Sequence, residues 1–352
     1  MKNKYWKNYV SILNENSHFI PSYFNRKIDD ISLDIEVIDN AKSTVSQLDL
    51  KTRNMPINIF NCEGELVKSS HHFRGPRHDF FKYDEKAVFD TSNSSEIVAG
   101  DTIYLGWLIP HYGHFLMETL SRLWVLELLE GRKSYKFLFN FYKDGNDFIK
   151  SKKWAEEFLL SFGIYKEDII FADNNYEYER LIIPQQSLVL HSNVNVKSQH
   201  YIWNKIKEYF KPEDSFGKRK VYLSRKLLRK EKRRLANEEE VEKIFSKLGF
   251  EIIYPEQISL KEQVELLHQS SVVVGPSGSA LHNAAFMQEG SLLISLTTTE
   301  FCLLNEVLCC YSAKTQYELF FGTSSDAREG VWSIDCNELE RMLASHKFIN
   351  SI

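Results

Sequence analysis

The sequence lacks the features that mark membrane-spanning, secreted and nucleic-acid-binding proteins. No apolar run approaches the roughly 20 residues that a bilayer-spanning helix needs. No apolar stretch follows the basic start of the chain, so we expect no signal peptide. The net charge is only −4, from 44 basic and 48 acidic residues, so no overall field attracts nucleic acid. We therefore expect a cytoplasmic protein whose contact with a membrane, if it has one, is peripheral.

Cysteine is also scarce and has no metal-site spacing. The five cysteines are Cys62, Cys302, Cys309, Cys310 and Cys336. Their odd number and the absence of a following histidine pair argue against a disulfide framework or a zinc site. We expect reduced core or surface thiols, as is usual inside cells.

What is present is enough for two compact α/β domains, because 352 residues exceed the usual size of a single core. Strand and helix patterns alternate in the second half, which predicts βαβ units and a parallel sheet. The expected strands are Lys220–Ser224, Phe250–Tyr254, Ser271–Val274 and Ser291–Leu296. The expected helices are Glu238–Leu248, Leu260–Gln269 and Ser279–Met287.

The first half predicts a second α/β unit with additional segments. Its expected strands are Asp34–Ile38, Ile57–Phe60, Thr102–Ile109, Lys136–Asn140, Ile169–Ala172 and Arg180–Ile183, and its expected helices are His111–Leu129 and Ser151–Phe162. A polar loop with a proline and a glycine over 211–217 indicates a boundary near 195–217. We assign domains to 1–205 and 206–352 and leave open whether the last helix packs back on the first domain.

Three loops that follow strands of the second half contain residues suited to a nucleotide diphosphate. Arg225 follows the first strand and opens a basic stretch that ends at Arg233-Arg234, Glu256 follows the second strand, and Gly275–Ser279 follows the third. Ligands of a doubly wound sheet bind outside the carboxyl ends of its strands, so these loops should meet. Arg225, one of the two later arginines and helix amides would bind the diphosphate, and Glu256 the ribose. Taken alone, a loop of this composition is as typical of a tight turn as of a phosphate site. The charged residues alone are as typical of a solvated surface as of a binding site.

The densest chemical cluster of the first half is the segment His111–Trp124. On a helix, His114, Glu118 and Arg122 lie four residues apart and share one face. A histidine oriented by a carboxylate is a candidate general base. The alternative is an ion pair between Glu118 and Arg122 with His114 as a packing residue. A metal site at His111 and His114 has no evident third ligand.

Together these segments resemble glycosyltransferase family 61, which includes bacterial capsule and lipopolysaccharide enzymes, plant xylosyltransferases and animal O-linked N-acetylglucosaminyltransferases. The matching segments are His111–Trp124, Tyr222–Arg225, Arg233–Glu238, Gly249–Glu251, Pro255-Glu256, Gln263, Gly275–Asn283 and Phe286. The resemblance covers about 100–296. One departure is that the family's glycine-containing loop usually has a histidine where Ser277 stands, and His282, one helical turn further on, is a candidate substitute.

The resemblance implies a GT-B-like α/β fold, with two Rossmann-like domains facing across a cleft, and inverting sugar transfer without an obligate metal or other cofactor. His114 and Glu118 match the family's histidine and acidic residue, Arg225 and Arg234 match its basic positions, and His111 and Arg122 would support the acceptor side. The residues expected to bind the donor are Arg225, Arg234, Glu256, Gly275, Ser277, Gly278, Ser279, His282 and Asn283.

The expected partners are a nucleotide-sugar donor, with a uridine nucleotide favoured, and a glycan or lipid-linked glycan acceptor of a capsule or lipopolysaccharide. Surplus cations suggest contact with anionic lipid. They are Lys218, Arg219, Lys220, Lys226, Arg229, Lys230 and Lys232. Two other functions remain open: a polysaccharide pyruvyl or phosphosugar transferase on a similar scaffold, and a non-catalytic glycan- or nucleotide-binding component of an export assembly. The sequence does not identify the sugar, the acceptor or the linkage.

Overall fold

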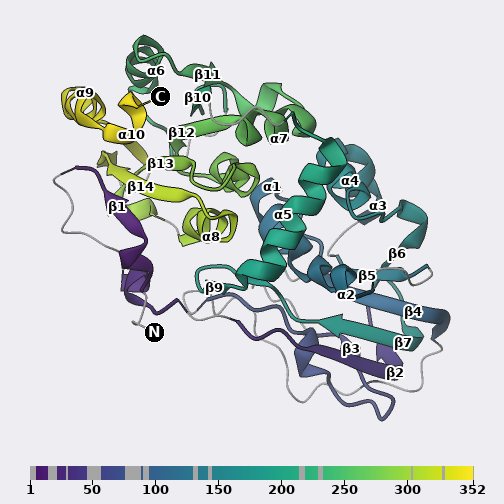
Figure 1. The fold of residues 1–352 in the computed structure, drawn as a ribbon. Helices are drawn as coiled ribbons and strands as arrows, with labels where there is room; N and C mark the ends of the chain where they lie inside the picture. The colour runs from purple at the N-terminus through teal and green to yellow at the C-terminus, as the bar shows by residue number, and fades with distance from the viewer. Residues whose placement is uncertain are drawn as a thin grey trace. The chain divides into compact units, whose positions relative to one another are not determined.

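A computed structural model of the chain describes residues 5–14, 22–28, 31–45, 57–75, 89, 95–129, 134–141, 145–213, 219–228, 233–302, 304–326 and 330–351. The chain forms two compact units (Figure 1). The N-terminal unit comprises residues 30–206, and the C-terminal unit comprises 1–29 and 207–352. The division falls inside helix α5, Val196–Phe210, within the range where the sequence indicates a boundary.

Each unit is built around a six-stranded sheet with helices, which confirms the α/β class. The sheet of the C-terminal unit has the order β1-β14-β13-β12-β10-β11, and all of its strand pairs are parallel. Its elements are η1 Trp6–Asn8, β1 Val10–Ile12, η3 Ser22–Asn25, β10 Arg219–Leu223, α6 Glu238–Lys247, β11 Glu251–Ile253, η7 Pro255–Gln257, α7 Leu260–His268, β12 Ser270–Pro276, η8 Ser279–Phe286, β13 Leu292–Thr297, η9 Thr299–Phe301, α8 Leu304–Ala313, β14 Gln316–Phe321, β15 Thr323–Asp326, β16 Val331–Ser333, α9 Cys336–Ser345 and α10 Lys347–Asn350.

All four strands expected in this half are present, and β10 lies between β11 and β12. The chain therefore reverses its direction of winding between β10 and β12, which is the topological switch point where such sheets bind ligands. Local signals agree with the pattern. A Ser259–Glu262 capping box starts α7, and Gly249, with a φ of 79°, follows α6.

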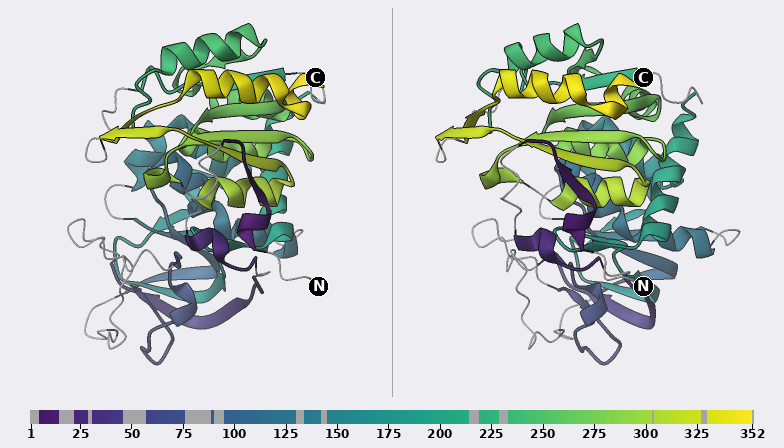
Figure 2. Two further views of the ribbon diagram at one scale, coloured as in Figure 1. Left: turned by 90° about the vertical axis from the view of Figure 1, so that its left-hand side faces the viewer. Right: turned by 60° about the vertical axis from the view of Figure 1, so that its left-hand side comes forward.

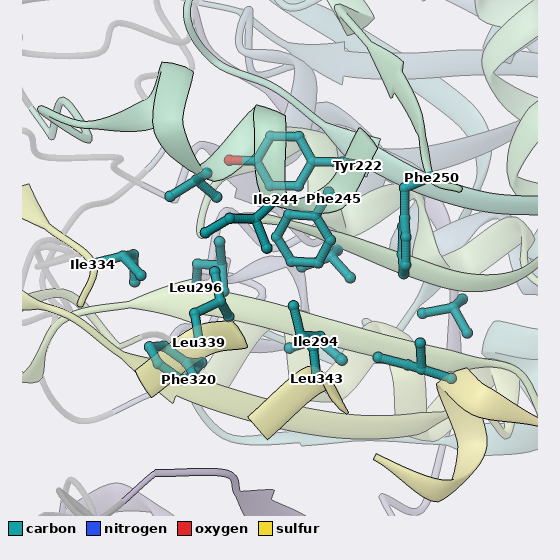
Figure 3. Packing of buried hydrophobic residues seen from close by; sticks show 14 of the residues in the cluster. Tyr222, Ile244, Phe245, Phe250, Ile294, Leu296, Phe320, Ile334, Leu339 and Leu343 are labelled. Carbon is teal, nitrogen blue, oxygen red and sulfur yellow. The ribbon is translucent and has the colours of Figure 1, made fainter. Parts of the chain in front are cut away.

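Side chains on one face of this sheet pack with residues of α6 and α9 to form a hydrophobic core. Figures 1 and 2 show α6 and α9 over one face of this sheet and α8 over the other. In Figure 3, Phe245 of α6 stacks on Tyr222 of β10, with ring centroids 4.9 Å apart, and Leu339 and Leu343 of α9 close the cluster. The last helices thus contribute Leu339, Leu343 and Ile349 to the core of the C-terminal unit.

The start of the chain also belongs to the C-terminal unit rather than to the first domain as expected from sequence. Strand β1 pairs with the edge strand β14, from Val10 opposite Tyr317 to Ile12 opposite Leu319. Trp6 is fully buried and packs edge-to-face on Tyr311. A three-residue strand that finds its partner some 300 residues later leaves no local pattern to read.

The N-terminal unit has a mixed sheet in the order β3-β2-β7-β4-β5-β6, in which β2 is antiparallel to β3 and β7. Its elements are β2 Ile35–Ser43, β3 Ile59–Phe60, η4 Lys68–Ser70, β4 Glu96–Trp107, α1 Tyr112–Met117, η5 Thr119–Val125, α2 Leu126–Leu129, β5 Lys136–Asn140, α3 Gly145–Ser151, α4 Lys153–Leu160, η6 Lys166–Asp168, β6 Ile169–Phe171, β7 Tyr176–Pro184, β8 Leu188–Val189 and β9 Asn193–Val194.

The helix expected over His111–Leu129 is interrupted. It is an α-helix only as far as Met117, continues as a 3-10 helix over Thr119–Val125 and returns to α geometry at Leu126. Glu118 lies at the break, with φ −109° and ψ −50°. The tighter 3-10 winding changes which side chains share a face, with consequences for Arg122 described below.

We expect Phe245→Ala to lower the free energy of unfolding of the C-terminal unit by about 3–5 kcal/mol, because it removes the ring at the centre of this core. Urea denaturation followed by circular dichroism measures the change. Leu227→Ala, at a side chain 45% exposed in the same unit, is the matched control and should change it by less than about 0.5 kcal/mol. Similar effects of the two substitutions would contradict the packing in Figure 3.

Candidate active site

A buried carboxylate organises the site of the N-terminal unit. The Glu118 side chain is 0% exposed. His114 Nδ1 lies 2.5 Å from its Oε2, His72 Nε2 lies 2.8 Å from its Oε1, and Arg74 Nη2 donates to Oε2 at 2.7 Å. Arg74 Nε also donates to Oε1. Since an ionised carboxylate only accepts hydrogen bonds, both histidines present an N–H to Glu118.

These contacts keep Glu118 ionised. Burial alone would raise the pKa of its carboxyl, but the charge of Arg74 and the hydrogen bonds from His114 and His72 hold that pKa well below its ordinary value. His72 differs, because its complete burial outweighs the attraction of Glu118 and lowers its pKa. Glu118 and Arg74 are therefore the permanent charges of the cluster, and His72 is a neutral donor.

His114 has the geometry of a general base. A short loop joins the end of β4 to the start of helix α1, so His114 lies near the carboxyl end of a central strand. Its Nδ1–H points at Glu118, which leaves the lone pair on Nε2. The side chain is 35% exposed, so a substrate hydroxyl can reach the ring. The carboxylate fixes the tautomer and would stabilise the imidazolium after proton uptake.

Arg122, expected on the same face, points elsewhere. It is 1% exposed, and its guanidinium donates to the carbonyls of Pro184 and His71. The 3-10 turn after Glu118 breaks the four-residue spacing of an α-helix, so no Glu118–Arg122 ion pair forms. Arg122 instead holds the backbone at His71, next to His72, and so has a supporting role. His111 is exposed at the start of α1, with its ring centroid 5.1 Å from that of His114.

Sequence reasoning missed His72 and Arg74, which complete the cluster. They come from the segment 71–75, which has no regular structure. Its backbone is fixed by Gln186, which accepts from the Phe73 N–H, and by Leu190, which accepts from Gly75. The run His71-His72-Phe73-Arg74 was a compositional signal, but its contact with Glu118 depends on long-range folding that no local pattern encodes.

In the C-terminal unit, Arg225 spans the switch point of the sheet. It follows β10, and its Nη1 donates to the carbonyl of Ser277, which follows β12, at 2.8 Å. Its own N–H donates to the buried carboxylate of Glu238 on α6 at 2.6 Å. Burial lowers the pKa of Arg225, and the carboxylates of Glu238, Glu306 and Glu256 oppose that shift.

The two glycines of the expected donor loop are required by close approach. A Cβ on Gly275 would lie 2.7 Å from the Leu223 carbonyl, and one on Gly278 would lie 2.1 Å from Arg225 Nη1. Glycine at both positions lets the ends of β10 and β12, and the Arg225 guanidinium, come together.

The Ser277 hydroxyl and the Gly278 amide of this loop, which the sequence predicts to face a phosphate, donate hydrogen bonds to a protein carboxylate instead. Glu306 of α8 is fully buried and accepts from Ser277 Oγ at 2.6 Å and from the Gly278 N–H at 2.9 Å. Its other oxygen accepts from Ser295 and Tyr317. Burial raises the pKa of Glu306, against the effect of these four hydrogen bonds. Ser277 and Gly278 thus hold the loop in place through their hydrogen bonds to Glu306.

The remaining expected donor residues have different environments. Asn283 is 1% exposed and donates to Gln263 of α7, and His282 is 7% exposed, so both lie inside the unit on η8. Ser279 is half-buried, and Glu256 is exposed on η7 after β11. The segment after the loop is a 3-10 helix rather than the expected α-helix.

Arg233, rather than Arg234, lies beside the loop. Its guanidinium carbon is 4.0 Å from the centroid of the Phe301 ring, and it lines a cavity together with Ser277. Burial, and next the charge of Arg225, lower the pKa of Arg233. Arg234 is exposed, and only its backbone, paired with Trp332, contacts this region among the described residues. A left-handed backbone at Arg233, with φ 65°, turns the two side chains apart.

The cations expected to contact lipid are in part engaged. Arg219 pairs with Glu251 at 2.5 Å, Lys226 lies 3.4 Å from Glu239, and Lys220 lies over the ring of Phe250. The others lie outside the described residues. They are Lys218, Arg229, Lys230 and Lys232.

None of the five cysteines forms a disulfide, and Cys309 and Cys310 are buried in α8. Within the described ranges no group of three or more histidine, cysteine, aspartate or glutamate residues is arranged to hold a metal ion. The helices of the described part include none long and apolar enough to cross a bilayer.

Comparison with known proteins identifies the family of the chain. The family model described as Glycosyltransferase 61 matches residues 112–294, more than half of the sequence. The chain belongs to glycosyltransferase family 61. No curated protein sequence matches it. Membership makes the protein a glycosyltransferase, with a sugar donor and an acceptor as substrates. The match begins at α1 and ends in β13, so it contains His114, Glu118, Arg225 and the loop at Gly275.

We expect Glu118→Gln to destabilise the N-terminal unit by about 3–5 kcal/mol at pH 7, because it leaves the Arg74 charge buried without its partner. The pKa of Glu118 is depressed on folding, so its stabilising contribution is complete above the ordinary value of 4.5 and is lost as the pH falls through the folded value. The difference between wild type and variant should therefore shrink in acid. Urea denaturation at several pH values measures it.

The matched control is Glu156→Gln, at an exposed carboxylate of α4 in the same unit. It should leave stability within about 0.5 kcal/mol of wild type at every pH. A Glu118→Gln protein as stable as this control would mean that the charge pair is not what holds segment 71–75.

Proposed function

We propose that this family 61 glycosyltransferase inverts the anomeric carbon while moving a sugar from a nucleotide-diphosphate donor, with UDP favoured, to a glycan acceptor. The observation that carries the proposal is the pair formed by His114 and the buried, ionised Glu118, 2.5 Å apart. Inversion by direct displacement requires a base for the acceptor hydroxyl, and this pair supplies an oriented imidazole with an accessible ring.

In the proposed reaction, His114 Nε2 accepts the proton of the acceptor hydroxyl while the hydroxyl oxygen attacks the anomeric carbon. The bond from that carbon to the phosphate oxygen breaks, and the nucleoside diphosphate leaves with the electron pair. Glu118 stabilises the imidazolium, and Arg74 balances the charge of Glu118 throughout. The proton then passes from His114 to solvent.

Arg225 and Arg233 are proposed to bind the leaving diphosphate. The two guanidinium groups are close enough for Arg225 to lower the pKa of Arg233, and like charges at such range repel each other unless an anion lies between them. A diphosphate satisfies both with charge-assisted hydrogen bonds. These cations offer the positive charge that a metal ion supplies in other transferases, so we propose a metal-independent reaction.

The finer architecture and setting follow from the same proposal. Each unit has residues of the expected chemistry at the carboxyl ends of its strands, which supports a GT-B arrangement with the two units facing across a cleft. We propose a lipid-linked or polysaccharide acceptor of a capsule or lipopolysaccharide, and action at the cytoplasmic face of the membrane. Exposed Leu227 and Leu228 beside Lys226 support contact with anionic lipid.

We expect His114→Ala to reduce turnover by about 10²- to 10⁴-fold, the usual contribution of a positioned general base. Release of UDP from UDP-sugars, with oligosaccharide or water as acceptor, measures turnover. His111→Ala removes a neighbouring imidazole but leaves the His114–Glu118 pair intact, and should cost less than about tenfold. Equal losses in the two variants would remove His114 from the role of base.

We expect Arg225→Gln to weaken binding of UDP and of inorganic pyrophosphate by about tenfold or more, because it removes a charge-assisted hydrogen bond from the diphosphate. Isothermal titration calorimetry measures both ligands. Arg234→Gln, at an exposed arginine of the same basic stretch, should change neither affinity by more than about twofold. Unchanged binding in Arg225→Gln would place the diphosphate elsewhere.

A further inference from the structure

A cavity of about 170 Å³ lies beside Arg233 in the C-terminal unit. Its walls include Ser277 of the donor loop, Thr297, Thr298 and Glu300 at the end of β13, and the rings of Phe301 and Trp332. A hydroxyl–carbonyl bond from Thr297 to Phe301, 2.5 Å long, fixes the turn that forms one wall. Of the residues that the sequence offers as donor ligands, Ser277 and the alternative arginine Arg233 contribute to this cavity.

The position of the cavity follows from the order of the strands. Their carboxyl ends succeed one another along the edge as β11, β10, β12 and β13. Glu256 lies at the end of β11, Arg225 and Gly278 lie at the β10–β12 switch point, and the cavity lies at the end of β13. A nucleotide sugar is linear in the same sense, with its diphosphate between nucleoside and sugar. With the ribose at Glu256 and the diphosphate at Arg225, the sugar falls at β13.

The lining has the chemistry of a sugar site. Thr298 is 6% exposed and brings a hydroxyl group to the wall, and Glu300 is an exposed carboxylate. Across the described residues, no hydrogen bond or ion pair involves the Glu300 side chain, so its oxygens are available to ligand hydroxyls. A few polar groups set among apolar and aromatic walls are typical of small-molecule sites.

The size is that of one six-membered ring, since a cavity of about 150 Å³ is known to hold benzene. Arg233, whose guanidinium lies over the Phe301 ring, lines the cavity together with Ser277 of the donor loop. Its left-handed backbone is a conformation that residues other than glycine adopt at some cost, and such conformations concentrate at ligand-binding positions.

We infer that this cavity holds the sugar ring of the donor, and that Thr298 and Glu300 select the sugar by hydrogen bonding to its hydroxyls. The inference rests on the proposed function, because it takes the diphosphate site at Arg225 as its reference point. It assigns sugar choice to the segment after β13, a part of the chain to which the sequence patterns gave no role.

The test compares free UDP with UDP-glucose, UDP-galactose and UDP-N-acetylglucosamine by calorimetry. Glu300→Gln should weaken the conjugate that wild type binds best by roughly tenfold, the equivalent of one hydrogen bond involving a charged group. Thr298→Val should weaken it by roughly fivefold, the equivalent of one neutral hydrogen bond. The same variants should leave the affinity for UDP within about twofold of wild type. The control is Glu289→Gln, an exposed carboxylate just before the amino end of β13, which should change neither.

Three outcomes would overturn the inference. Equal weakening of UDP and of its conjugates would mean that the cavity binds the nucleoside. If neither variant changed any affinity, the cavity would bind no part of the donor. If wild type bound UDP and the conjugates equally well, the sugar would contribute nothing to binding. The proposed function fails separately. It fails if wild type does not bind UDP, or if Arg225→Gln binds UDP as well as wild type, whatever Thr298 and Glu300 do.

Discussion

The ionised Glu118 carboxylate, buried without access to solvent, is the constraint on which the N-terminal unit depends. A charge in such a place is tolerable only when opposite charge and hydrogen-bond donors surround it. The chain meets this requirement from two distant segments, with His114 one helical turn away and His72 and Arg74 more than forty residues earlier. The same contacts that make the burial possible also fix the His114 tautomer, so one group determines both the stability of the buried charge and the orientation of the imidazole.

Buried carboxylates that accept hydrogen bonds also hold the loops of the C-terminal unit in place. Glu238 on α6 and Glu306 on α8 are buried carboxylates that accept backbone N–H groups from Arg225 and Gly278. Helices from the two faces of the sheet thereby fix the two strand ends at the switch point. The Gly278 amide donates to Glu306, and the Arg225 guanidinium donates to the Ser277 carbonyl. The loop therefore supports the Arg225 guanidinium rather than presenting a row of free amides.

The sequence predicted what short-range periodicity encodes and missed what depends on distant pairing. The apolar runs of β10, β12 and β13 and the amphipathic pattern of α7 are local, and the sequence predicts all four elements. The four-residue spacing also found His114 and Glu118, whose pairing needs only one helical turn. The position of Arg122 was predicted wrongly because the helix tightens to 3-10 geometry after Glu118, and the composition of the segment does not indicate that change.

Other misses have equally physical causes. Pairing of β1 with β14 joins residues some 300 positions apart, and the contact of Arg74 with Glu118 joins residues 44 positions apart, so neither has a sequence period. Arg233 lies over the Phe301 ring and Arg234 is exposed, and that choice between two adjacent arginines depends on contacts with residues distant in the sequence. Such information is tertiary, and propensity does not contain it.

The extent of the family match divides the molecule by chemical task. Residues 112–294 include the imidazole–carboxylate pair and the guanidinium at the switch point, to which the proposed function assigns the two groups present in every reaction of this type: a hydroxyl proton and a leaving diphosphate. Arg74 precedes the matched segment, and the turn at Thr298 and Glu300 follows it. A transferase can keep its reaction while changing its sugar only if the groups that read the sugar are separate from those that move the proton and bind the phosphates. The end of β13 satisfies that condition, because its side chains border the cavity while the buried carboxylates that brace the loop lie behind it.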